Sequence, residues 1–331
     1  MGGGNYTANT KDAYVKWKEQ GLLETKLKII SDYYSYKEAR GLIYNLLGVS
    51  EATRAKFKKN EYVSLQTLES ICRYLSVSVN EIVSFETVEN PSLLYKRLKE
   101  EMVHKIKGGI YDETQILLTY NSNHIEGSRL TPDQTRYIFE TNTIGLDKDT
   151  TVNIDDVIET QNHFKCIDYM IKSSLEPLSE DLIKDLHRIL KSGTSDAKLE
   201  WFNVGEYKLR PNVVGGSKTT KPSDVSVAMA SLIGKYENKK TFSFEDIIEF
   251  HYNFEIIHPF QDGNGRVGRL IAFKECLRHG IVPFTIDESI KLFYYRGLKE
   301  WENEKGFLLE TCLTGQDKYK KLMDLFEINY S

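Results

Sequence analysis

The sequence predicts an all-α protein that carries one short β-hairpin, and three observations support this fold class. Apolar residues recur at helical spacing almost without interruption from Ser92 onward. Proline is scarce, with 7 among 331 residues, so few positions interrupt a helix. Residues 205–216 are the exception, because their glycines bracket Tyr207, Val213 and Val214 and favour a hairpin or an ordered loop.

Composition indicates a globular protein of about two domains, with 40% apolar and 28% charged residues. The net charge of −4 excludes a general attraction to nucleic acid or membrane, so any basic site must be local. The 4 cysteines form no CxxC pair, which argues against a disulfide framework or a zinc knuckle and favours the reducing cytoplasm. No apolar run approaches the roughly 18 residues of a membrane helix, and the polar start is no signal peptide. We therefore expect no membrane partner.

The N-terminal part is expected to divide into a tail and a small domain. Residues 1-21 begin with a glycine triplet among polar residues and are predicted to be a flexible tail. Residues 22-86 are predicted to form several short helices, with a break at residues 47–50 and Ser64 as an N-cap. A linker then leads into a larger domain, residues 87-331.

The most informative segment runs from His258 to Arg269 with the sequence HPFQDGNGRVGR. A helical pattern over Phe244–Ile257 precedes it, and Pro259 ends that helix. Helical spacing resumes over Val267–Arg278. The segment is therefore predicted to be a tight loop between two helices.

The residue types of this loop suit phosphate chemistry. The run from Gly263 through Asn264 to Gly265 permits backbone angles that turn N–H groups inward at a helix start, where an anion is favoured. Arg266 and Arg269 are three positions apart, so both can reach the same phosphates from one helix face.

Two further side chains complete the set. Asp262 offers a hard oxygen ligand that suits Mg²⁺ between phosphates. His258, at the mouth of the loop, can accept a proton near neutral pH. The segment thus combines an anion nest, a metal carboxylate, two phosphate clamps and a base. The alternative is a glycine-rich helix connection with incidental charges.

This segment resembles the signature of the Fic family, HxFx(D/E)GNGRxxR, and matches every specified position. The resemblance implies a helical core that uses ATP and Mg²⁺ to place AMP on a protein hydroxyl. In that reaction the histidine deprotonates the hydroxyl, which attacks the α-phosphate, and Mg-pyrophosphate leaves. By position, the resemblance implies His258 as the base, Asp262 as the Mg²⁺ ligand, Gly263 to Gly265 as the phosphate nest, Arg266 and Arg269 as clamps, and Phe260 as the inward-packing residue that holds the loop.

A second segment, SNHIEG from Ser122 to Gly127, closes a helix predicted over Asp112–Ile125. It is similar to the family's inhibitory motif, (S/T)xxxE(G/N). A carboxylate at a helix C-terminus is disfavoured by the helix dipole, so Glu126 gains from a cationic partner. The resemblance implies that this partner is Arg269, which would then be withdrawn from the γ-phosphate. The alternative is an exposed glutamate followed by a glycine cap.

Two weaker resemblances concern ligand contacts. Residues 205–210 resemble the family's flap, which aligns a target segment by strand addition and implies target contacts for Glu206, Tyr207 and Lys208, although the family often has Arg at the last position. Residues 292–295 resemble a late aromatic helix near the adenine, which implies nucleotide contacts for Tyr294 and Tyr295. The alternatives are an ordinary surface hairpin and an aromatic core stripe.

Residues 36–85 resemble a Cro/repressor-type helix-turn-helix, with residues 50–59 as the recognition helix and Val63–Tyr74 and Val79–Phe85 as supporting helices. Four cations within six positions suit DNA phosphates: Arg54, Lys56, Lys58 and Lys59. Residues 22-86 nevertheless carry 9 Lys/Arg against 8 Asp/Glu, a net charge of only +1, and Arg54 stands where this fold usually has an apolar residue. The alternative is a helical module that docks a protein.

Together these patterns predict a protein adenylyltransferase that is inhibited by its own Glu126. One alternative is a hydrolase that removes AMP, with Glu126 orienting water. Another is a DNA-binding transcriptional regulator whose Fic domain senses nucleotide, although His258 argues against it because nucleotide binding needs no base. The expected partners are a protein with an accessible hydroxyl, the chain itself as an acceptor, and DNA.

Overall fold

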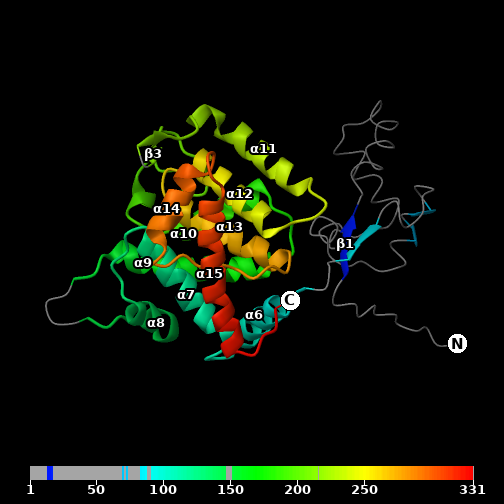
Figure 1. Cartoon of the computed structure of the whole chain (residues 1–331), viewed down its shortest axis with the longest axis horizontal. Helices are drawn as coiled ribbons and strands as arrows, with labels where there is room; N and C mark the ends of the chain where they lie inside the picture. Colours follow the sequence, from blue (N-terminus) through cyan, green and yellow to red (C-terminus); the bar gives the residue numbers. More distant parts are fainter. Residues whose placement is uncertain are drawn as a thin grey trace. The chain divides into compact units, whose positions relative to one another are not determined.

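The computed structural model describes residues 13–17, 69–70, 72–73, 83–87, 91–146, 151–214 and 216–330. The chain divides into two compact units, Met1–Asn90 and Pro91–Ser331. The predicted domain border, after residue 86, lies a few residues before this division. Figure 1 shows the second unit as a body of packed helices.

In the first unit, β1 (Ala13–Trp17) pairs antiparallel with β2 (Val83–Thr87), in a register that sets Ala13 opposite Thr87. This pairing differs from two predictions. Residues 13–17 belong to a strand and not to a flexible tail, and the predicted helix Val79–Phe85 is replaced by a strand from Val83. The sequence VSFET alternates apolar and polar residues, and this period of two favours a strand over a helix.

Most other predictions for the first unit lie outside the described residues. These include the rest of the tail, the recognition helix, and Arg54, Lys56, Lys58 and Lys59. Residues 69–70 and 72–73 are helical, within the supporting helix predicted over Val63–Tyr74.

The second unit is a succession of helices, as the all-α prediction requires. Its elements are α6 (Leu93–His104), α7 (Ile110–Ile125), α8 (Pro132–Thr141), α9 (Ile154–Lys172), α10 (Glu180–Lys191), η1 (Asp196–Lys198), β3 (Val213–Val214), β4 (Ser217–Lys218), η2 (Pro222–Asp224), α11 (Val225–Glu237), α12 (Phe244–Ile257), α13 (Asn264–Arg278), α14 (Lys291–Glu300) and α15 (Gly306–Leu325). Side chains that accept a backbone N–H bond cap several helix starts, which fixes where those helices begin: Ser92, Thr131, Asn153, Ser179 and Ser243.

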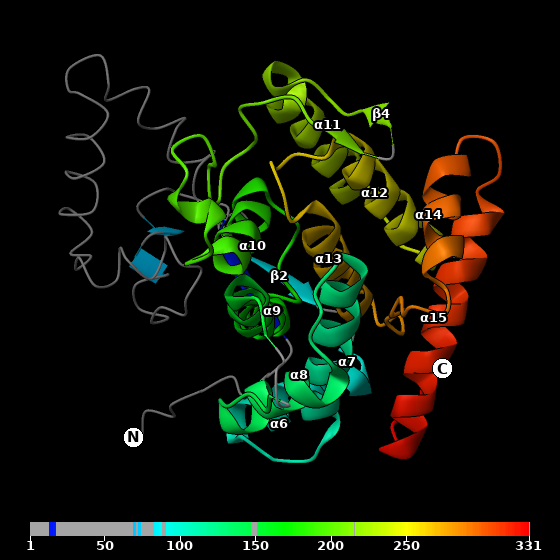
Figure 2. The same cartoon turned by 90° about the vertical axis from the view of Figure 1, so that its left-hand side faces the viewer.

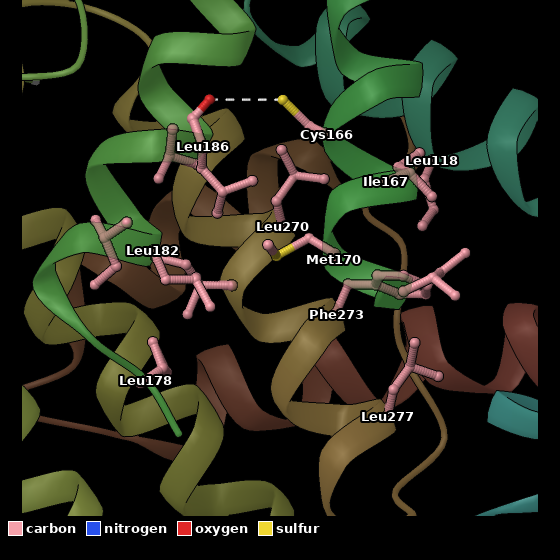
Figure 3. Close-up of a cluster of buried hydrophobic side chains, with 14 of the residues drawn as sticks. Leu118, Cys166, Ile167, Met170, Leu178, Leu182, Leu186, Leu270, Phe273 and Leu277 are labelled. Atoms are coloured by element: carbon pink, nitrogen blue, oxygen red, sulfur yellow. Dashed lines mark hydrogen bonds between the residues drawn. The ribbon is translucent and has the colours of Figure 1, made fainter. Parts of the chain in front are cut away.

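Helix α13 lies at the centre of this unit, between α10 and α12 (Figure 2). Of its 15 residues, 12 are buried. Apolar side chains of α13 pack against those of α9 and α10, as Figure 3 shows for Phe273, Met170 and Leu186. Because burial of apolar surface is the main force in folding, the position of α13 is strongly determined. Its N-terminus is therefore a rigid platform.

The hairpin lies further along the chain than the flap prediction placed it. Val213–Val214 pair with Ser217–Lys218, and Gly216 (φ 83°) supplies the left-handed backbone of the turn. Residues 205–210 form turns and irregular backbone instead. The two β-branched valines explain the shift, because they fit an extended strand better than the preceding Glu-Tyr-Lys segment does.

Within the described ranges, every helix falls short of the length or the apolar character needed to cross a membrane.

Candidate active site

The loop between α12 and α13 is closed by its own residues. His258 takes a left-handed backbone (φ 51°), and its N–H caps α12 by donating to Phe254 O at 2.9 Å. The Asn264 side chain then spans the loop, accepting from Phe260 N at 2.8 Å and donating to Phe260 O at 2.9 Å. Phe260 is fully buried and stacks on His187, with ring centroids 4.0 Å apart. Phe260 thus holds the loop as expected, and the Asn264 side chain is used internally.

The N-terminus of α13 faces an anion. Gly263 precedes the helix in a left-handed conformation (φ 78°), and no side chain caps it. The first N–H groups of a helix have no intrahelical partner, and the dipole there favours negative charge. A Cβ at Gly265 would collide with the Glu126 carboxylate. Glycine at this position therefore lets a carboxylate come directly against the first turn of α13.

Arg269 and the second segment meet, as the resemblance implied. Arg269 Nη2 lies 2.7 Å from Glu126 Oε1 and donates to Ser122 O at 3.0 Å, while Arg269 Nε donates to Ser122 Oγ at 3.1 Å. The side chain of Arg269 is 9% exposed and that of Glu126 is 31% exposed. Gly127, at φ 101°, turns the chain away directly after the glutamate. The guanidinium is thus largely occupied by Ser122 of α7 and by Glu126, the residue that caps the end of α7.

Arg266 and Asp262 belong to a second ion network that the sequence patterns did not indicate. Arg266 pairs through Nη1 with Glu159 and through Nη2 with Asp262 Oδ2 at 3.2 Å. Lys191 Nζ lies 2.5 Å from Glu159 Oε1 and 2.7 Å from Asp262 Oδ2. Glu159 and Lys191 stand far from the signature in sequence and form no recognisable motif with it. Only their place on α9 and α10 brings them to the loop.

Electrostatics sets the protonation states of His258 and Asp262. Burial, assisted by the Lys208 ammonium, lowers the pKa of His258 to about 4, so the imidazole is neutral at pH 7. Burial acts to raise the pKa of Asp262, but Arg266 and Lys191 outweigh it and bring this pKa to about 2. At neutral pH the loop therefore presents a neutral base and a carboxylate anion.

Asp262 is the candidate Mg²⁺ ligand, with a side chain that is 49% exposed. Among the described residues no group of three or more His, Cys, Asp or Glu side chains is arranged to hold a metal ion. A single carboxylate still fits Mg²⁺, because this ion takes most of its ligands from phosphates and water. The residues present thus suit a metal that arrives with a nucleotide.

Of the two tyrosines expected to contact the nucleotide, the structure buries Tyr294 and leaves Tyr295 exposed. Tyr294 is 1% exposed, and its hydroxyl lies 2.7 Å from His251 Nε2 inside the protein. Tyr294 and Gly297 are three positions apart and therefore share one face of α14, and this face is buried. Tyr295 points the other way, is 42% exposed, and donates from its hydroxyl to Ile125 O at 3.4 Å, next to Glu126.

Two of the three residues expected in the flap, Tyr207 and Lys208, contact the loop, and none of the three lies in a strand. Lys208 N donates to Pro259 O at 2.9 Å, and the buried Lys208 ammonium donates to Thr219 Oγ1 at 2.6 Å and to Ile257 O at 3.3 Å. Tyr207 packs on Phe260, with ring centroids 5.8 Å apart. Glu206 stays exposed and pairs with Lys184 at 2.9 Å. The Lys208 side chain is thus buried, and the expected target contact of residues 206–208 stays a prediction.

Comparison with known families is consistent with this geometry. Residues 177–275 match the Fic/DOC family, and residues 43–87 match the Cro/C1-type HTH DNA-binding domain. The first match contains the whole loop from His258 to Arg269. Both family resemblances predicted from the sequence are thereby confirmed.

Curated relatives include enzymes named protein adenylyltransferase Fic. The one from Drosophila willistoni is 28% identical over 183 residues, which is 54% of this chain and 35% of the relative. The one from Aedes aegypti is 27% identical over 186 residues, 55% of this chain and 36% of the relative. The chain thus matches only about a third of the length of these relatives.

Solved structures share the fold. A Fic domain containing signaling protein from Bacteroides thetaiotaomicron aligns with a TM-score of 0.54 and 25% identity, over 71% of this chain and 89% of that one. A Fic family protein from Desulfovibrio desulfuricans aligns with a TM-score of 0.51 and 20% identity, over 72% of this chain and 77% of that one.

Proposed function

We propose that this chain, through its Fic/DOC domain, transfers AMP from ATP to a Ser, Thr or Tyr hydroxyl of a protein and that Glu126 restrains the transfer. The observation that carries the proposal is the convergence, at the loop and the first turns of α13, of a neutral histidine, a carboxylate, a helix N-terminus without a side-chain cap and two arginines. The relatives named as adenylyltransferases support the same reaction.

The reaction follows from these side chains. The phosphates of ATP lie at the first turn of α13, where backbone N–H groups, Arg266 and Arg269 offset their charge. His258 takes the proton of the target hydroxyl as the hydroxyl oxygen bonds to the α-phosphorus. The bond from that phosphorus to the pyrophosphate oxygen then breaks, and pyrophosphate leaves with the electron pair. Mg²⁺, held by Asp262, would supply further positive charge beside the phosphates.

Restraint by Glu126 rests on the competition of two anions for one place. The Glu126 carboxylate lies against Gly265 and on Arg269, where a terminal phosphate of ATP also has its best partners. When Glu126 holds Arg269, the γ-phosphate loses that clamp and the α-phosphate is misaligned with His258. A change that frees Arg269 restores the alignment.

The proposal also covers the acceptor, DNA binding and the cellular compartment. The chain itself can serve as an acceptor when a hydroxyl reaches the loop, and the helix-turn-helix over residues 43–87 is compatible with DNA binding. The sequence has 4 cysteines and no CxxC pair, which favours the reducing cytoplasm.

The decisive experiment uses ATP labelled at the α-phosphate. We expect the Glu126→Gly protein to label itself or proteins of a cell lysate, and the same protein with His258→Ala to lose the label while it still binds ATP. Equal labelling by both proteins would refute His258 as the base. Loss of label from a premodified protein in the presence of wild type, but not of Glu126→Gly, would instead assign AMP removal as the activity.

A further inference from the structure

Lys191 and Glu159 form a buried frame behind the metal carboxylate. Lys191 is the last residue of α10, and its side chain is 2% exposed. A lysine ammonium has three N–H donors, and here it has three carboxylate neighbours: Glu159 at 2.5 Å, Asp262 at 2.7 Å and Asp196 at 3.3 Å. These three carboxylates restrict the position of the Lys191 ammonium.

The backbone beneath Lys191 is fixed as well. Asn162 of α9 donates to Leu190 O at 3.0 Å and to Ser192 O at 2.7 Å, one residue on each side of Lys191. A Cβ at Gly263 would lie 3.6 Å from Lys191 Cδ, so the lysine stem packs closely under the loop. The position of the ammonium is therefore set by α9, α10 and the loop together.

The contacts close into a ring. Asp262 Oδ2 meets both Lys191 and Arg266, and the two oxygens of Glu159 meet the same two cations. Both ion pairs of Asp262 use Oδ2, which orients the carboxylate and leaves Oδ1 on the other edge. With Asp196 included, two cations face three carboxylates, so the cluster carries a net charge of 2 − 3 = −1.

We infer that Lys191 and Glu159 are positioning residues, which fix the orientation of Asp262 toward an Mg²⁺–ATP complex and that of Arg266 toward its phosphates. Outer partners that orient a metal ligand commonly change metal affinity by about 10- to 100-fold. The inference rests on the proposed function, since it assigns Asp262 the metal that accompanies ATP.

Charge and position make opposite predictions for Lys191→Met. Loss of one positive charge takes the cluster from −1 to −2, so charge alone would strengthen the hold on Mg²⁺. Loss of the contact that orients Asp262 would instead weaken Mg²⁺ binding. Glu159→Asp keeps the charge at −1 and shortens the side chain by one methylene, so charge alone predicts no change whereas a lost frame predicts weaker binding.

The test measures ATP dissociation constants by calorimetry, in EDTA and in Mg²⁺, in the Glu126→Gly protein. The readout is the dissociation constant in EDTA divided by that in Mg²⁺, which measures how much Mg²⁺ strengthens ATP binding. A merely structural defect would leave this ratio unchanged. We expect Lys191→Met and Glu159→Asp each to lower this ratio about tenfold. Lys172→Met, an exposed lysine at the end of α9, is the matched control and should leave it unchanged.

Each outcome bears on the inference. A ratio that stays within twofold or rises in Lys191→Met overturns it, and so does an unchanged ratio in Glu159→Asp, which serves alone if Lys191→Met fails to fold. Failure of the Glu126→Gly protein to bind ATP in either medium would refute the proposed function and this inference with it. Normal Mg²⁺-dependent ATP binding without AMP transfer would refute the proposed function only.

Discussion

Replacement of Glu126 by glycine should raise the rate of AMP transfer well above that of the wild-type protein. The carboxylate lies 2.7 Å from Arg269 Nη2, and the Arg269 side chain is only 9% exposed, so the pair is partly shielded from water. Glycine removes the anion without disturbing the end of α7, because Gly127 already makes the turn with a left-handed backbone.

The size of the effect follows from the contact. A hydrogen bond to a charged group contributes about 1.5–3 kcal/mol net, and the 31% exposure of Glu126 places this pair at the lower end. A γ-phosphate that recruits Arg269 must first break this contact. Since about 1.4 kcal/mol corresponds to a factor of ten, we expect transfer to rise about 10- to 30-fold.

The assay is the initial rate of α-phosphate label incorporation at ATP concentrations below saturation. Arg269→Ala added to Glu126→Gly should remove the gain, because the inhibitor and the clamp are then both absent. Glu327→Gly is the matched control, since it makes the same exchange at an exposed position after α15. A Glu126→Gly protein no faster than Glu327→Gly would refute the restraint by Glu126.

Three other predictions concern separate groups. His258→Ala should slow transfer by about 10²- to 10⁴-fold with an ATP dissociation constant near that of its parent, measured by calorimetry; a matching loss of binding would contradict a base. Because the pKa of His258 is lowered from 6.5 to about 4, the folded protein binds fewer protons there between these values, and kcat/KM should stay level down to about pH 5. An acid limb centred near pH 6.5 would contradict this. If DNA binds residues 50–59, neutralising Lys58 and Lys59 should flatten the dependence of affinity on salt, and no DNA binding at about 50 mM salt would favour protein docking.

The active loop could be predicted from sequence because its chemistry is local. His258, Asp262, Gly263 and Arg266 lie in the loop and the first turn of α13 that follows it, so their order along the chain nearly determines their arrangement in space. The preceding helix also agreed, since α12 spans the expected Phe244–Ile257, whereas α13 begins at Asn264, three residues before the expected Val267. The Glu126–Arg269 pair could be predicted only from the resemblance to a known family motif, because the two residues lie far apart in sequence.

Tertiary structure decided what depends on residues far apart in the chain. Glu159 and Lys191 reach Asp262 because α9 and α10 pack on α13, and no spacing within the sequence encodes that meeting. Tyr294 and Tyr295 are neighbours of the same type, yet the face of α14 that packs inward buries the first and exposes the second. Sequence order specified the reactive loop, whereas burial and helix packing selected the charges that surround it, because ion pairs form only where separate elements bring side chains within a few ångströms.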